Sequence, residues 1–578
     1  MFSQNNTKFK ELANLFNELE KTSSSLVMID ILANFFQKVS AEEAKLTAYL
    51  LKGKITPDYL GGEFGLAQKL VIRAIARAYN LSIEEVEKNF YKKGDLGNVA
   101  EELSNKKDSE LTIIEVFKQL KQIVDSSGEG SQEQKINILS DLLKKSSFLE
   151  AKYIIRIVLG VLRLGVGDMT FLYGLSKFLV GSKKAKKTLE HAYNIFSDLG
   201  EVCYEALKYG LKKLEQAEPV VGIPTRMMLA QRINNLQEIK NHILGNVFVE
   251  YKYDGERIQA HIQKDKIELF SRKHENITHQ FPDLIENLKK AFTGKNAIIE
   301  GEVVAINKKN NTLENFQILM TRRRKYDIDK YIKEVPIKYF IFDILYINNK
   351  SLIYKKLIDR KKEIYNNFQE NNEINFAKCI ITSDIEEIEA FFDKAIENGA
   401  EGIMIKDAES IYQAGIRGWN WIKFKKDYRD ELADTFDLVV VGALYGTGRR
   451  AGTYGSLLLA SFDPKYNRYY TFTKVGAGFT DKDLEEIPKK LNKFKINKKH
   501  HLVETNMKAD VWFEPKLVME VRGAEITISP VHTVAINIIK NGGLALRFPR
   551  FVRWRDDKSA EDSTTPDEIY QIYKIKNK

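Results

Sequence analysis

Apolar residues recur every three or four positions through the first 216 residues, which is the spacing of helices with one buried face. The clearest stretches are residues 9–19, 29–39, 113–123 and 136–143. The polar, glycine-containing segment 125–131 is the one long interruption that we expect among these helices. The sequence therefore predicts an all-α domain over residues 1–216.

The hydrophobic pattern changes after residues 218–224, where Pro219, Gly222 and Pro224 break the helical spacing and indicate a linker. Further on, short strands alternate with helices, and we expect strands over residues 247–253, 297–306 and 337–347. The last of these is apolar on both faces apart from Asp343, which is typical of a strand inside a sheet. These features predict an α+β domain over residues 217–428.

The remaining chain is rich in β segments separated by glycine-containing turns. The segments are residues 436–444, 456–462, 469–475 and 516–528. Several short strands with turns between them are typical of a small barrel. We therefore expect a β-barrel domain over residues 429–578.

Composition narrows the class of protein and its partners. The chain has 578 residues, a net charge of +11 and a pI near 9.0, which favour a polyanionic partner. Its two cysteines, Cys203 and Cys379, cannot form a disulfide framework or a four-cysteine zinc site. No export signal and no run of about 18 apolar residues is evident. We expect a cytoplasmic, nucleoid-associated protein that does not contact a membrane.

The segment around Lys252 carries the first candidate chemistry. Strand alternation places Glu250, Lys252 and Asp254 on one face, opposite Tyr251 and its apolar neighbours. A lysine in this setting can attack phosphorus if nearby cations or a metal lower its pKa. The alternative is a solvated lysine on a surface strand, and this short segment alone does not exclude it.

Further segments follow Lys252 in a fixed order: SRKHENIT at 271–278, EGEVVA at 300–305, YFIFDIL at 339–345, EGIMIK at 401–406 and WNWIKFKKDY at 419–428. Their order and spacing resemble the nucleotidyltransferase motifs of ATP-dependent DNA ligases. Residues 546–550 and 555–558 resemble the last motif of that family. Residues 162–167, LRLGVG, are similar to the DNA-binding domain of archaeal and eukaryotic replicative ligases. The resemblance covers the whole chain and implies a DNA-binding domain, an adenylation domain and an OB-fold.

The resemblance implies that Lys252 is the catalytic nucleophile, which takes AMP from ATP and passes it to a nick. It also implies a set of nucleotide-binding residues: Glu250 at the adenine amino group, Phe342 stacked on adenine, Arg257 and Arg272 at ribose and phosphate, Glu302 at ribose, and Arg417 and Lys423 at the phosphates.

Carboxylates supply the hard oxygen ligands that magnesium requires. Glu300 and Glu302 share one strand face, and either side chain is long enough to reach a ribose or a metal ion. The resemblance assigns Glu302 and Glu401 as the Mg²⁺ ligands. Lys423 and Lys425 alternate onto the same face as Trp421, and their charges could also lower the pKa of Lys252.

Other cationic segments point toward DNA or pyrophosphate. Arg547, Arg550, Arg555 and Lys558 form a basic cluster that the resemblance assigns to pyrophosphate orientation, with a DNA-facing patch as the alternative. Residues 162–167 are expected to hold duplex phosphates without reading bases. The loop 446–450 lacks the spacing of a Walker loop, so we interpret it as a barrel loop near DNA.

The leading hypothesis is a monomeric ATP-dependent DNA ligase that encircles duplex DNA. It would seal 5′-phosphate and 3′-hydroxyl nicks during replication, repair and recombination. Residues 105–111 lack the glutamine-led clamp motif of many archaeal relatives, which leaves a sliding-clamp partner open. An RNA ligase or a capping guanylyltransferase shares the lysine chemistry, but neither needs the helical domain. A non-catalytic DNA-end-binding protein is the third reading, and preference for ATP over other nucleotides stays open.

Overall fold

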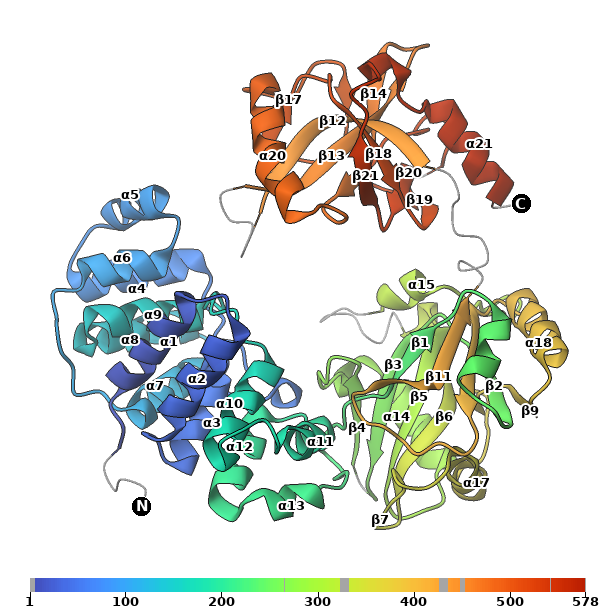
Figure 1. Ribbon diagram of the computed structural model, residues 1–578, viewed down its shortest axis with the longest axis horizontal. Coiled ribbons are helices and arrows are strands. Elements are labelled where there is room, and N and C mark those ends of the chain that lie inside the picture. The colour runs from blue at the N-terminus through green and yellow to red at the C-terminus, as the bar shows by residue number, and fades with distance from the viewer. Residues whose placement is uncertain are drawn as a thin grey trace. The chain divides into compact units, whose positions relative to one another are not determined.

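The computed structural model describes residues 6–264, 266–322, 332–425, 435–446, 453–540 and 542–576. The chain forms two compact units, one ending at Phe424 and one beginning at Lys425. The first unit combines a helical part with a part built on two sheets, and the second is built around another sheet (Figure 1). The expected domain boundary between residues 428 and 429 lies outside the described residues.

The helical part begins the first unit, as the periodicity predicted. The four predicted stretches fall largely within α1, α2, α7 and α8, and the chain breaks between α7 and α8 where expected. Its elements are α1 Phe9–Glu20, α2 Ser25–Phe36, α3 Ala41–Leu50, η1 Asp58–Leu60, α4 Gln68–Tyr79, α5 Ile83–Lys93, α6 Leu96–Leu103, α7 Ile113–Asp125, α8 Ser131–Lys145, α9 Phe148–Val158, α10 Asp168–Val180, α11 Lys186–Phe196, α12 Leu199–Tyr209 and α13 Leu211–Glu215.

The expectation that segment 125–131 is the one long interruption is wrong, because residues 104–112 and 159–167 are longer connections than the five residues between α7 and α8. The longest connection among these helices is residues 51–67. It joins α3 to α4 and contains one short 3₁₀ turn, η1. Gly53, Gly61, Gly62 and Gly65 have positive φ there, and Pro57 precedes η1. Residues with these backbone preferences do not continue a helix.

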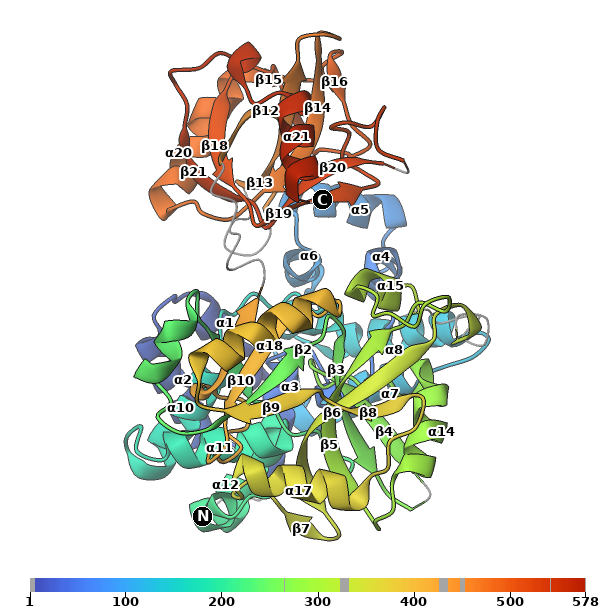
Figure 2. The same ribbon diagram turned by 90° about the vertical axis from the view of Figure 1, so that its right-hand side faces the viewer.

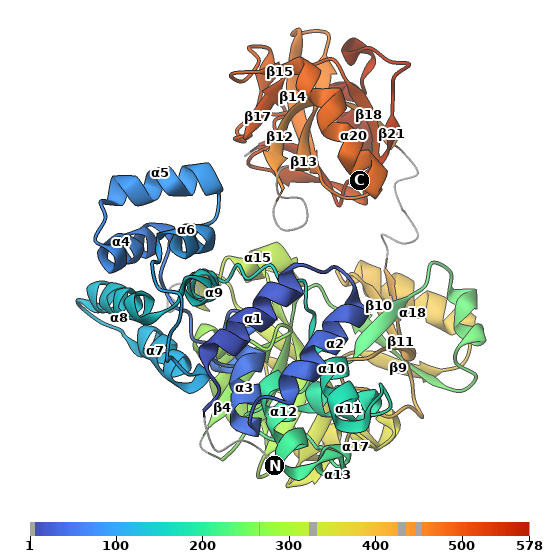
Figure 3. The same ribbon diagram turned by 60° about the vertical axis from the view of Figure 1, so that its left-hand side comes forward.

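The helices surround α9, whose residues from Glu150 to Val158 are all buried. In Figure 3, α10 lies beside α2 and α12 beside α3, and these pairs are in contact. Arg156 of α9 is buried and forms ion pairs with Glu20 at 2.9 Å and Asp95 at 3.2 Å. Asp95 also pairs with Arg163 at 3.3 Å. The turn at residues 162–167 is thereby tied to the helical core.

The second part of the first unit contains two sheets with helices beside them (Figure 2). The first has the order β1-β11-β10-β2-β9. Its strands are β1 Leu229–Arg232, β2 Val247–Lys252, β9 Cys379–Thr382, β10 Gly402–Asp407 and β11 Arg417–Lys425. The second has the order β4-β3-β5-β6-β7, and β8 also pairs with β6. Its strands are β3 Glu256–Ile262, β4 Ile267–Ser271, β5 Ala297–Ala305, β6 Ile337–Ile347, β7 Lys350–Ser351 and β8 Ile374–Phe376.

The three predicted strands of this part are confirmed as β2, β5 and β6. The connecting helices are η2 Leu236–Asn241, η3 Thr278–Gln280, α14 Pro282–Ala291, α15 Phe316–Met320, α17 Leu357–Asn367 and α18 Ile385–Glu397. Strand β6 lies between β5 and the short strands β7 and β8, so its position inside a sheet is also confirmed. The predicted α+β character of this region is therefore correct.

Alternation along β2 separates a hydrophobic face from a charged one, as predicted. Val249, Tyr251 and Tyr253 belong to a core shared with α18. Glu250 and Lys252 point to the opposite face, and antiparallel pairing with β10 sets Met404 opposite Glu250 and Gly402 opposite Lys252. Two residues of β2 are therefore presented side by side on the charged face.

The Asp343 carboxylate, the one acidic group in β6, is paired with Arg360 of α17. The guanidinium donates to both carboxylate oxygens, at 2.8 and 2.9 Å, and both side chains are fully buried. Such a pair is tolerated inside a protein because each charge satisfies the other. This contact fixes α17 against the second sheet.

The second unit is built around an eight-stranded sheet in which β12 pairs with β13, β17 and β18. The predicted segment 516–528 forms two strands in different sheets, β18 and β19, separated at Gly523. The elements are β12 Thr435–Tyr445, β13 Tyr454–Asp463, β14 Arg468–Val475, α20 Asp481–Leu491, η5 Asn492–Phe494, β15 Lys495–Ile496, β16 Val503–Glu504, β17 Val511–Phe513, β18 Val518–Arg522, β19 Glu525–Ser529, β20 Gly543–Arg547, β21 Arg550–Trp554, η6 Ala560–Asp562 and α21 Pro566–Lys576.

The predicted linker packs against the second sheet through a buried histidine. His261 Nδ1 accepts a hydrogen bond from the Gly222 amide at 2.9 Å, so the neutral ring carries its proton on Nε2, 2.8 Å from Gln259 Oε1. Gln259 Oε1 also accepts from the Thr225 amide at 2.8 Å. Burial lowers the pKa of His261 to about 3. The contact therefore requires the neutral imidazole.

We predict that His261 makes the first unit less stable in acid. An unfolded histidine takes up a proton near pH 6.5, whereas folded His261 stays neutral down to about pH 3. Stability is therefore lost as the pH falls through this window. Between about pH 7 and about pH 5, His261→Asn should lose less free energy of unfolding than the wild type, measured by denaturant titration. Exposed His279→Asn is the control, and equal pH slopes for wild type and His261→Asn would contradict the prediction.

Candidate active site

Lys252 is the last residue of β2, and its side chain contacts the carboxylate of Glu401, which directly precedes β10. Its Nζ is 2.5 Å from Glu401 Oε2, and its carbonyl accepts a hydrogen bond from the Glu401 amide at 2.8 Å. Both side chains remain partly accessible, at 23% each. The amine is thus held in place but open to a reaction partner.

Two carboxylates set the charge state of Lys252. Burial alone lowers the pKa of its ammonium group, but the charges of Glu401 and Glu302 outweigh burial and leave the pKa above its ordinary value. Burial also raises the pKa of Glu302 to about 7, against the opposing effect of Lys252. The net shift of the Lys252 pKa is therefore upward, whereas Lys423 and Lys425 were expected to lower it.

Glu250 is buried and held by two lysines. Lys361 Nζ of α17 lies 2.5 Å from Glu250 Oε1, and Lys406 Nζ of β10 lies 2.7 Å from Oε2. All three side chains are at most 3% exposed. Burial lowers the pKa of Lys406 to about 8 despite the attraction of Glu250. The carboxylate is therefore fixed at both oxygens.

Glu300 and Glu302 differ sharply in their surroundings, although they share the predicted strand face. Glu300 is fully buried and accepts hydrogen bonds from Arg257 at 2.7 Å, Tyr412 at 3.0 Å and Gln259 at 3.1 Å. Glu302 is only partly buried. The interpretation that either carboxylate could reach a ligand is corrected, because Glu300 is committed to internal partners.

Arg257 is part of the same internal network, although it was expected at the ribose. It donates to the Met228 carbonyl and to Glu300, both at 2.7 Å. Its guanidinium lies 5.2 Å from the ring centres of both Phe342 and Trp421. These contacts place a largely buried cation behind the two aromatic rings.

Phe342 lies at the boundary between two hydrophobic cores and is partly exposed. Its ring meets the buried Trp421 edge to face, with centroids 6.1 Å apart. Lys406 Nζ lies 4.4 Å from the centre of the Phe342 ring and 4.2 Å from that of Trp421. The structure therefore brings Phe342, Arg257 and Lys406 to one aromatic cluster.

The remaining predicted nucleotide contacts lie on other elements. Arg272 is exposed in the turn after β4. Arg417 begins β11 and donates to the Ala230 carbonyl at 3.0 Å, while Lys423, further along β11, is paired in register with Arg232 of β1. Arg417 and Lys423 thus lie on the same strand, which is paired with β1, whereas Arg272 lies on a separate turn.

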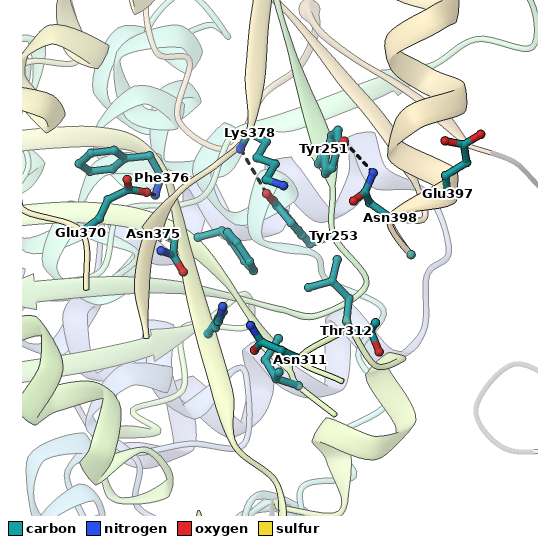
Figure 4. Close-up of a pocket in the computed structure, with 15 residues that line it drawn as sticks. Tyr251, Tyr253, Asn311, Thr312, Glu370, Asn375, Phe376, Lys378, Glu397 and Asn398 are labelled. Atoms are coloured by element: carbon teal, nitrogen blue, oxygen red, sulfur yellow. Dashed lines mark hydrogen bonds between the residues drawn. The ribbon is translucent and has the colours of Figure 1, made fainter. Parts of the chain in front are cut away.

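A pocket of about 510 Å³ lies on the opposite face of β2, lined by Tyr251 and Tyr253 rather than Lys252 (Figure 4). The Tyr253 hydroxyl accepts a hydrogen bond from the Lys378 amide at 3.2 Å, and Asn398 donates to the Tyr251 hydroxyl at 3.4 Å. These contacts support β2 from behind. The pocket itself is distinct from the site around Lys252.

Three family profiles match consecutive parts of the chain: DNA ligase N terminus at residues 8–176, ATP dependent DNA ligase domain at 227–425, and ATP dependent DNA ligase C terminal region at 450–558. A DNA ligase of Sulfurisphaera tokodaii is 43% identical, and one of Staphylothermus marinus is 44% identical, each over 98% of both chains. The chain belongs to the ATP-dependent DNA ligase family. The resemblance seen in the motifs is confirmed, and this ligase is an enzyme that forms phosphodiester bonds with ATP as its substrate.

The fold agrees with this family. The solved structure Pmar-Lig_Pre covers 94% of this chain and 99% of its own at 18% identity, with a TM-score of 0.54. At this level of identity the likeness concerns the fold alone. A helical N-terminal part, a central adenylation domain and a C-terminal sheet unit are the architecture of this ligase.

The carboxylates at Lys252 suit a magnesium ion that is shared with phosphates. Glu302 and Glu401 both act on the Lys252 ammonium, so their charges face one place. Magnesium is usually bound by one or two carboxylates, with phosphate and water oxygens completing its shell. No group of three or more His, Cys, Asp or Glu side chains among the described residues is placed to hold a metal. The donor set of this ligase therefore fits a shared ion rather than an all-protein cage.

Three of the four residues of the basic cluster have acidic partners, beginning with Arg547, which lies 3.0 Å from Glu525. Arg555 pairs with Asp437 and Asp557, both at 2.7 Å, and Lys558 lies 2.9 Å from Asp437. Residues 447–450 of the loop assigned to the DNA side lie outside the described residues.

Among the described helices of the ligase, none combines the length and the hydrophobicity that a membrane span needs.

Motif reasoning missed Lys361, Lys406 and Tyr412. Lys406 shares strand parity with Gly402 and Met404, which pair with Lys252 and Glu250, so alternation could have found it. Lys361 stands in the charged helical run DRKKE, which is typical of an exposed face. Its burial arises from tertiary packing, and no local signal indicates it.

We predict that the two arginines expected near the nucleotide differ in their effect on stability. Arg257→Met leaves Glu300 buried without its cation and should lower the free energy of unfolding of the first unit by about 3–5 kcal/mol. Exposed Arg272→Met should change it by less than about 0.5 kcal/mol. Denaturant titration of both variants beside the wild type makes the comparison. A similar loss in the two variants would contradict the assignment of Arg257 to the internal network.

Proposed function

We propose that this ligase seals nicks between a 5′-phosphate and a 3′-hydroxyl in duplex DNA, with Lys252 as the covalent nucleophile. The observation that supports the proposal is the position of the Lys252 amine, partly accessible and 2.5 Å from Glu401 at the end of a rigid strand. We further propose that the reaction serves replication, repair and recombination.

In the first step, Lys252 loses a proton and its nitrogen bonds to the α-phosphorus of ATP. The bond from that phosphorus to the bridging oxygen breaks, and pyrophosphate leaves. An oxygen of the DNA 5′-phosphate then attacks the same phosphorus, the P–N bond breaks, and Lys252 regains a proton. Finally the 3′-hydroxyl loses its proton, attacks the 5′-phosphorus and displaces AMP, which forms the phosphodiester bond.

The nucleotide is proposed to lie on the charged face of β2. Glu250 would accept a hydrogen bond from the adenine amino group, and Phe342 would stack on the base. Arg257 supports the Phe342 ring from behind, while Arg272 at the ribose and Arg417 and Lys423 at the phosphates would supply positive charge. The partly exposed ring of Phe342 supports this placement.

Magnesium is proposed to bind Glu302 and Glu401 together with phosphate oxygens. A cation there would neutralise the carboxylates that hold the pKa of Lys252 high and would stabilise charge developing on the phosphates. Glu401 also keeps the Lys252 backbone in position through its amide, independently of any ion.

Duplex DNA is the proposed macromolecular substrate, and we propose that the ligase binds it as a monomer. The turn at residues 162–167 would hold duplex phosphates, since Arg163 is partly exposed and tied to Asp95. We propose that the C-terminal sheet unit is an OB-fold, supported by the antiparallel pairing of β12 with β13, β17 and β18. The sequence does not assign a sliding clamp as a partner, because residues 105–111 carry no clamp motif.

We predict a covalent AMP adduct on Lys252. Incubation with α-labelled ATP and magnesium, followed by a denaturing gel and peptide mass spectrometry, should place AMP on this lysine. Lys252→Ala should form no adduct yet bind nicked duplex as tightly as the wild type by fluorescence anisotropy, while exposed Lys240→Ala keeps both properties. Nick sealing by Lys252→Ala at the wild-type rate would falsify the covalent mechanism.

Magnesium removal should abolish adduct formation reversibly. With EDTA no AMP should be retained, and added Mg²⁺ should restore the adduct. Glu302→Gln and Glu401→Gln should raise the magnesium concentration needed for half-maximal adduct about 10-fold or more, because each removes one anionic ligand. Exposed Glu409→Gln is the control. An unchanged magnesium requirement in both site variants would remove these residues from the proposed metal site.

A further inference from the structure

Helix α17 sends two consecutive cations to two different sheets. Arg360 pairs with Asp343 of β6 in the second sheet, and Lys361 pairs with Glu250 of β2 in the first. Asp343 directly follows Phe342 in the chain. One turn of helix therefore anchors the strand of the proposed stacking residue and the side chain of the proposed base-reading residue.

Lys361 controls the Glu250 carboxylate itself. Its Nζ is 2.5 Å from Oε1, and both side chains are at most 3% exposed. Lys406 holds the other oxygen at 2.7 Å. With a cation at each oxygen, the carboxylate cannot rotate without losing a charged contact. An ionised carboxylate only accepts hydrogen bonds.

This acceptor-only state matters for the base. The 6-position of adenine carries an amino group that donates, whereas the 6-position of guanine carries an oxygen that accepts. A fixed, ionised Glu250 would therefore favour adenine and repel guanine. If Lys361 were lost, Oε1 would lose its cation, and the Glu250 carboxylate would be free to turn out of this position.

We propose that Lys361 is a positioning residue of the nucleotide site that makes the ligase select ATP over GTP, acting through the Glu250 carboxylate. This inference rests on the proposed function of Glu250. Lys361 is not expected to touch the nucleotide, because its amine is already engaged with Glu250 and is 3% exposed.

The test measures covalent AMP and GMP formation with α-labelled ATP and GTP across nucleotide concentrations. Lys361→Met should lower the ratio of kcat/KM for ATP to that for GTP about 10-fold or more, mainly through a higher KM for ATP, because a buried ion pair with Glu250 is lost. Lys361→Arg should recover part of the ratio. Lys362→Met, a neighbouring lysine that is 66% exposed, should leave it unchanged.

A second background separates positioning from folding. In Glu250→Gln the charge that Lys361 balances is absent, so adding Lys361→Met should spare the fold and move the ratio by less than about two-fold. This pair also serves if Lys361→Met alone fails to fold. A large further drop in the double variant overturns the proposal, as does an equal loss for both nucleotides in Lys361→Met.

The outcomes distinguish the inference from the proposed function. If the wild type forms no adduct with any nucleotide, the covalent mechanism fails. If the wild type forms AMP adduct but shows no preference over GTP, or keeps its preference in Lys361→Met, only the role of Lys361 fails.

Discussion

The site depends on buried charges that α17 neutralises. Asp343 and Glu250 lie in different sheets with almost no exposure, and a carboxylate in such a place is stable only with a bound cation. Arg360 and Lys361 supply both cations from adjacent positions. A single turn of α17 therefore connects the two sheets and fixes their spacing at this point. The aromatic cluster lies beside this connection, so its geometry depends on the same spacing.

The surroundings of Lys252 follow the opposite principle. Glu302 and Glu401 stand close enough to influence each other, and burial leaves the pKa of Glu302 near 7. Two neighbouring carboxylates repel each other, and a cation between them reduces this repulsion. The Lys252 ammonium is that cation, 2.5 Å from Glu401. The contact that holds the amine in position also opposes loss of its proton. Attack on phosphorus therefore requires another positive charge to replace the Lys252 ammonium as the partner of the carboxylates.

Local pattern predicted more of the fold than of the network. Alternation placed Glu250 and Lys252 on one face of β2 and identified β6 as an inner strand, because both depend on neighbours in the sequence. It could not separate Glu300 from Glu302, which share a face but differ in what Arg257 and Tyr412 contact. These partners come from distant strands and loops, so only tertiary packing reveals that one carboxylate is internal and the other is available.

The basic cluster of the second unit shows how a charged group can be held and still be available. Arg555 and Asp437 are only 15% and 13% exposed, so their pair is shielded and orients the guanidinium. Asp557, the second partner, is 64% exposed, and exposed pairs contribute little to stability. If this cluster orients pyrophosphate, as the motif implies, a phosphate oxygen can displace Asp557 at small cost while Asp437 keeps Arg555 in place. The asymmetry of the two pairs thus separates a shielded contact that orients the guanidinium from an exposed contact that is easily exchanged.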